Sequence, residues 1–110
     1  MGRYITTTGT ALPVLREISA AHNAAVGERL LCNSTSAAFN ITLPLNTTLV
    51  VGDVIQIIDA TGTFATNNVT VQGNGALIQG TTETLVCDVA NSVITLLFTG
   101  NTYGWVVTSS

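Results

Sequence analysis

Apolar and polar side chains alternate strictly in Phe39-Asn40-Ile41-Thr42-Leu43, and Pro44 then interrupts the pattern. A period of two is typical of a β-strand with one buried face, and proline ends such strands. Residues 54–58 and 84–89 have the same strand character, and residues 93–99 form a nearly continuous apolar run. The sequence therefore predicts an all-β chain.

Turns follow one another at intervals of about 8–12 residues, which is typical of antiparallel sandwiches and barrels. The last hairpin is the clearest, because β-branched and aromatic residues lie on both of its arms, at residues 93–99 and 103–108. We expect residues 26–110 to form an antiparallel β-sandwich or jelly-roll-like domain.

Residues 1–25 lack this regular alternation, since glycine and proline interrupt them. Residues 14–25 allow two interpretations: an apolar stripe along a helix, or a strand at 14–18 followed by an alanine-rich loop. The β character of the rest of the chain favours the strand. We expect residues 1–25 to be an extended N-terminal arm that attaches to neighbouring protein by adding strands, through Arg3, Tyr4 and Ile5.

Charge is scarce: 8% of the residues are charged, against about 25% in an ordinary soluble domain, and there is no lysine. The net charge of −3 excludes a surface that follows nucleic-acid phosphates and argues against binding to an anionic membrane. Thr, Asn and Ser make up about a third of the chain. Because such a surface lacks the charges that keep monomers apart, we infer that other protein covers much of it. The alternative is a Thr-rich extracellular β-domain.

The sequence contains no catalytic motif. His22 is the only histidine, and no nucleophile or carboxylate lies at motif spacing from it. The six carboxylates are dispersed, and there is no CxxC pair. We therefore expect no enzyme activity, no metal site and no cofactor. Cys32 and Cys87 lie in apolar stretches and no export signal precedes them, so buried free thiols are favoured over a disulfide.

Two pairs of neighbouring charges are candidate interface residues, namely Arg16 with Glu17 and Glu28 with Arg29. They are interpreted either as buried or interfacial ion pairs between subunits, or as surface pairs of little energetic value. Tyr103 and Trp105 allow two roles as well. On a C-terminal strand they anchor a core or an interface, and as exposed aromatics they would stack on a sugar.

The order of several motifs between residues 28 and 108 resembles a β-module that is frequent in virion proteins of tailed bacteriophages, including cyanophages. The motifs are Phe39 to Pro44, Gly52 to Asp59, Asn67 to Val71, Gly75 to Gly80, and Phe98 to Val107. The resemblance implies a trimeric module on fibres, needles or capsid protrusions, and it carries no catalytic residues.

On this resemblance we expect a homotrimeric, non-enzymatic structural protein of the virion, assembled in the host cytoplasm. A capsid decoration or cement protein is favoured, with the major capsid protein as partner. The alternative is a tail-fibre or tail-tip protein that contacts tail proteins and binds a host receptor or surface carbohydrate. Nucleic acid and membrane are not expected partners.

Overall fold

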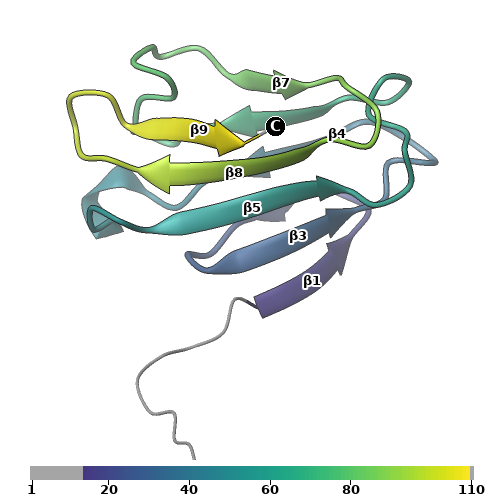
Figure 1. Ribbon diagram of the computed structural model, residues 1–110, viewed down its shortest axis with the longest axis horizontal. Helices are drawn as coiled ribbons and strands as arrows, with labels where there is room; N and C mark the ends of the chain where they lie inside the picture. Colours follow the sequence, from purple (N-terminus) through teal and green to yellow (C-terminus); the bar gives the residue numbers. More distant parts are fainter. Residues whose placement is uncertain (1–13, 110) are drawn as a thin grey trace, which may run out of the picture.

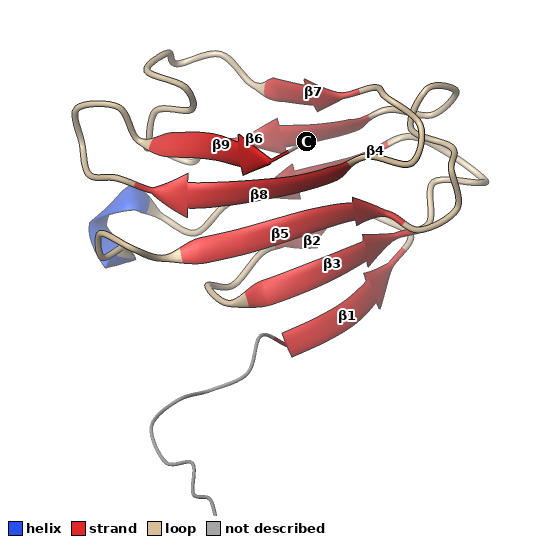
Figure 2. Ribbon diagram, in the orientation of Figure 1, coloured by secondary structure: helices blue, strands red, loops and turns tan. Residues whose placement is uncertain are grey.

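The computed structural model describes residues 14–109, which form strands and one short 3-10 helix (Figures 1 and 2). The all-β expectation is thus confirmed. The elements are β1 (Val14–Ile18), β2 (His22–Asn23), β3 (Glu28–Cys32), β4 (Phe39–Thr42), η1 (Asn46–Thr48), β5 (Val54–Asp59), β6 (Val69–Gln72), β7 (Leu85–Cys87), β8 (Val93–Phe98) and β9 (Trp105–Ser109).

Two sheets share these strands. The five-stranded sheet has the order β1-β3-β5-β8-β9, and the four-stranded sheet has the order β2-β4-β6-β7. From β1 to β6 the chain passes alternately from one sheet to the other. Consecutive strands within each sheet therefore run parallel, so the chain winds like the coils of a parallel β-helix.

The expected antiparallel, jelly-roll-like arrangement is wrong for this coil. Only the C-terminal pairings, β5 with β8, β8 with β9 and β6 with β7, are antiparallel. The physical reason is that side-chain alternation identifies a strand and its buried face but not its partner. The predicted final hairpin is confirmed as β8 and β9, with a register irregularity between Thr95 and Leu96.

The expected arm boundary at residue 25 is also corrected. Residues 14–18 pair with β3 and residues 22–23 pair with β4, so residues 14–25 belong to the two sheets. The strand interpretation of residues 14–18 holds, and the helical one does not. Arg3, Tyr4 and Ile5 lie outside the described residues.

The apolar core lies between the two sheets and is one cluster to which both contribute. Leu30, Ile57 and Ile94 lie beside one another in register on the inner face of the five-stranded sheet, and all three are buried. Ile41 and Val71 do the same on the four-stranded sheet. Cys32 and Cys87 are buried free thiols in this core, as expected, and burial raises the pKa of each to about 12.

Candidate functional site

A cluster of polar side chains lies beside the core at the end of the coil formed by β1 and β2. Glu28 is its centre: one carboxylate oxygen accepts a hydrogen bond from Arg16 Nε at 2.8 Å, and the other lies 3.0 Å from His22 Nε2. The Ala25 backbone N–H also donates to Glu28, at 2.8 Å. The Glu28 side chain is only 7% exposed, so this carboxylate joins β1, β2 and β3 from inside.

The electrostatics of Glu28 follow from these contacts. Burial by itself raises the pKa of a carboxyl group, because it penalises the charged form. Hydrogen bonds from Ala25, His22 and Arg16 outweigh that effect, and the pKa of Glu28 lies below its ordinary value. The cluster therefore links strands β1, β2 and β3 through one charged carboxylate.

The predicted charged pairs separate in the structure. Arg16 contacts Glu28 on the adjacent strand rather than its chain neighbour Glu17, which is exposed. Arg29 is exposed as well, and its Nε donates to Gln56 Oε1 at 3.1 Å. Gln56 in turn donates to Thr95 Oγ1 at 3.0 Å. Arg16 and Glu28 thus form an ion pair within the chain, with Glu28 buried and Arg16 half-exposed, whereas Glu17 and Arg29 lie on the surface; pairing between subunits stays a prediction.

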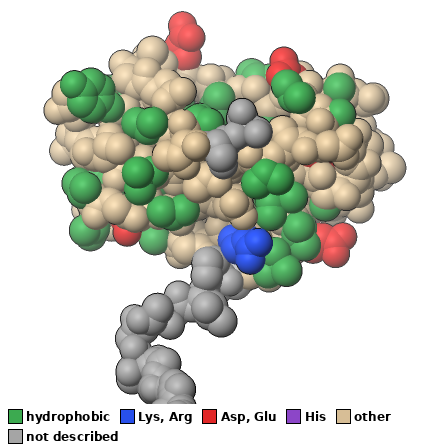
Figure 3. Space-filling model, in the orientation of Figure 1, with side chains coloured by type: hydrophobic (Ala, Val, Ile, Leu, Met, Phe, Trp, Pro, Cys, Tyr) green, Lys and Arg blue, Asp and Glu red, His purple; other side chains and the backbone are tan. Residues whose placement is uncertain are grey.

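This Arg29–Gln56–Thr95 ladder crosses the outer face of the five-stranded sheet, between two rows of apolar side chains. The register places the members of each row side by side on adjacent strands. All are half-buried or exposed. One row is Leu31, Ile58 and Val93, and the other is Val54, Leu97 and Val106. We call these six residues the apolar face. Figure 3 views the five-stranded sheet from outside and shows hydrophobic side chains among uncharged polar ones, with few charged groups.

The outer face of the four-stranded sheet has a different chemistry. Asn40 lies beside Thr70, and Thr42 lies beside Gln72. Thr42 Oγ1 is 3.5 Å from Gln72 Oε1. Val86, which is 46% exposed, follows Thr70 in register on β7. This face alternates with the core in the ordinary way of a sheet that has one side in water.

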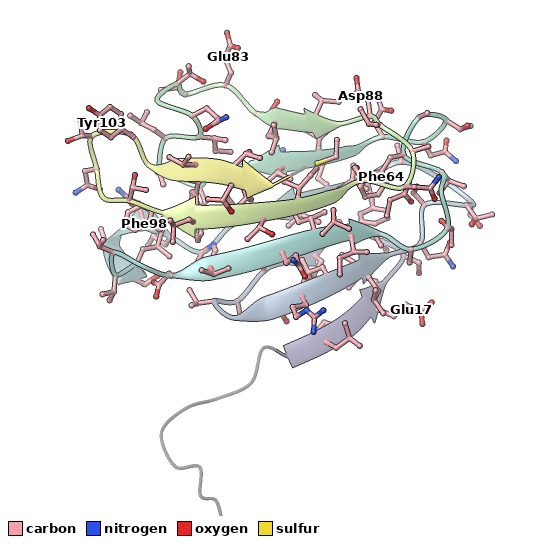
Figure 4. All side chains as sticks on the ribbon, in the orientation of Figure 1. Glu17, Phe64, Glu83, Asp88, Phe98 and Tyr103 are labelled. Atoms are coloured by element: carbon pink, nitrogen blue, oxygen red, sulfur yellow. The ribbon has the colours of Figure 1, made fainter. Side chains whose placement is uncertain are left out.

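The two aromatic residues predicted as candidates for surface recognition differ in exposure. Trp105 is fully buried and packs edge-on against Phe98, with ring centroids 5.4 Å apart. Of the two interpretations of Trp105, the core anchor holds and the role in surface recognition is wrong, because its position on β9 turns the ring into the core. Tyr103 is 63% exposed in the turn between β8 and β9 (Figure 4). The close approach of this turn to Leu77 requires glycine at position 104, where φ is +72° and a Cβ would lie 2.0 Å from the Leu77 carbonyl oxygen.

Residues 14–109 contain neither a candidate metal centre nor a candidate membrane-spanning helix. No three His, Cys, Asp or Glu side chains gather there in a way that could hold a metal ion. That part of the chain also lacks a helix with the length and apolar character needed to cross a membrane. No family model matches the chain, and no curated protein matches it.

Sequence reasoning missed two parts of this arrangement. It gave His22 no role, because a lone histidine carries no motif and its contact with Glu28 depends on pairing between strands. It also missed the apolar face. The signal was present in residues 30–32, 54–58 and 93–98, where, apart from Gln56 and Thr95, apolar residues occupy consecutive rather than alternate positions. Strands of that kind are typical of sheets covered on both faces.

Proposed function

We propose that the protein is a non-enzymatic structural component of a tailed-bacteriophage virion, a capsid decoration or cement protein built as a homotrimeric β-sandwich module. The observation that carries the proposal is the apolar face, since a monomer in water rarely leaves both rows of such a sheet uncovered. The scarcity of charge supports it further, because subunits of low charge pack side by side without repulsion.

The proposed partners are other copies of the chain and a virion protein such as the major capsid protein. Quantitative mass spectrometry of purified phage particles whose genome encodes the protein tests whether the protein is part of the virion. We expect the chain in hundreds of copies per particle, in a fixed ratio to the major capsid protein. Its absence from washed particles would overturn the proposal.

A tail-fibre or tail-tip protein is the second candidate, because Tyr103 is a well exposed aromatic and an amide- and hydroxyl-bearing face lies on the other sheet. Such groups suit a host glycan, with the ring as a stacking platform. In the same experiment this function predicts a few to a few dozen copies per particle. A glycan array then compares the protein with Tyr103→Ala, which removes the ring from an exposed turn, and with Thr102→Ala as the matched control.

A further inference from the structure

We propose that the apolar face is the surface through which one copy of this chain packs against a second copy. The inference rests on the proposed function, for which it names the contact between subunits. It does not depend on where in a virion the protein sits.

The apolar face has the composition of a sheet surface that other protein covers. In β5 and β8 both the inward and the outward positions are largely apolar, apart from Gln56, Thr95 and the buried Asp59 at the end of β5. Gln56 accepts a hydrogen bond from Arg29 and donates one to Thr95, so its amide is satisfied within the polar row between the apolar rows. The four-stranded sheet provides the internal comparison, because there the same chain places Asn, Thr and Gln outward.

The charges beside the apolar face favour a second copy of the chain as the protein that covers it. Glu17 lies on β1 and Arg29 on β3, and both point to the same outer side of the five-stranded sheet. Among residues 14–109, neither has an ion-pair partner. A face that carries one cation and one anion is complementary in charge to neighbouring copies whose faces turn toward a common threefold axis, where Arg29 of one chain can meet Glu17 of the next.

The remaining exposed acids do not oppose this contact. Glu83 and Asp88 project beside β7, on the far side from β1 (Figure 4). Asp53 precedes β5 and accepts a hydrogen bond from the Val50 backbone N–H at 2.7 Å. Two copies therefore meet through this face without a cluster of like charges.

The test uses the full chain and two lysine substitutions that are matched in residue and exposure. Val93 is 38% exposed within the apolar face, and Val86 is 46% exposed on the outer face of the other sheet. We expect light scattering at micromolar concentration to find an oligomer for the unaltered protein and for Val86→Lys. Val93→Lys should weaken association by about a hundredfold or more, because the ammonium group would lose its water in the contact. Circular dichroism and the melting temperature verify that both variants fold.

Two further variants test the proposed contact between Arg29 of one copy and Glu17 of another. Arg29→Glu should weaken association about tenfold, and the double variant Glu17→Arg with Arg29→Glu should restore it. A monomeric unaltered protein, an oligomer that survives Val93→Lys, an equal loss in Val86→Lys, or no rescue in the double variant would each overturn the inference. A monomeric protein would refute the proposed homotrimer together with the inference, whereas the place of the protein in the virion is tested separately by the copy number per particle.

Discussion

Asp59 is the last residue of β5, and its carboxylate holds two turns to the end of that strand. The backbone N–H groups of Thr63 and Phe64 donate to it at 3.1 Å each, and that of Asn91 donates at 2.9 Å. Burial tends to raise the pKa of this carboxyl, but the backbone hydrogen bonds from Asn91, Phe64, Thr63 and Gly62 outweigh it and hold the pKa below its ordinary value. The charge thus fixes the backbone of two loops, one of which places Phe64 in the core.

A substitution at Asp59 should reveal this contribution through its dependence on pH. Because the folded-state pKa is lower than the unfolded one, the stabilisation is present above about pH 4 and is lost as the pH falls through the folded value. Asp59→Asn should lower the free energy of unfolding by about 2 kcal/mol at pH 7. Urea unfolding at pH 7 and pH 3 measures the change, and the difference between variant and unaltered protein should shrink at pH 3.

Asp88→Asn is the control, since Asp88 is exposed and should change the free energy of unfolding by less than about 0.5 kcal/mol. An Asp59→Asn variant as stable as the unaltered protein at pH 7 would contradict the assigned role.

Among the elements, β1 and β2 stand out because they are the outermost strands of their sheets at one end of the coil. β2 has only two residues, and backbone pairing alone gives it little stability. Glu28 adds stability that backbone pairing does not provide, because its carboxylate contacts both Arg16 on β1 and His22 on β2. The inward-facing Arg16 also makes the edge less favourable for pairing with unrelated strands.

Glu28→Gln should loosen this end of the coil while the rest stays folded. The amide keeps the shape of the side chain but loses the charge that strengthens three hydrogen bonds. We expect amide hydrogen exchange in β1, β2 and at Ala25 to quicken about tenfold, with β5 and β8 unchanged. Glu83→Gln, at an exposed carboxylate, should leave the exchange pattern as it is. Uniformly faster exchange throughout the sheets would contradict the local role of Glu28.

The strands themselves were predictable from residue order, and their partners were not. The hairpin of β8 and β9 is local, so the Gly100-Asn101 turn and its apolar arms indicate it directly. The parallel pairing of β3 with β5 joins Arg29 to Gln56, and no nearby residue marks that contact. The sequence left two roles open for Trp105 for a related reason. Whether an aromatic points inward depends on the strand register, which the turn before Trp105 sets through its pairing with Phe98.

At the scale of the whole molecule, the core between the sheets is closed to solvent. Cys32 lies on the five-stranded sheet and Cys87 on the four-stranded one, and both face inward. Because burial raises both thiol pKa values to about 12, the reactive thiolate is scarce at neutral pH. The two thiols therefore report on separation of the sheets.

Thiol titration should find both groups unreactive in the folded protein and reactive in denaturant without a reducing agent. The rate in the folded protein should follow the rate of opening, since the reagent reaches the sulfur only when the sheets part. Thr102→Cys, in an exposed turn, is the positive control and should react at once. Rapid reaction of Cys32 or Cys87 in the folded state would show that the core is open to reagents.

Because the chain winds in one sense from β1 to β6, further windings could be added at only one end of the molecule. Each passage from one sheet to the other and back lays a new pair of strands beside the last pair, in the same sense. At the β7 and β9 end, antiparallel strands reverse the chain and terminate that repetition. An extra winding designed into such a chain therefore belongs ahead of Val14, where its strands could continue the parallel pairing of β1 and β2. The same segment placed after β9 would find no parallel strand to follow.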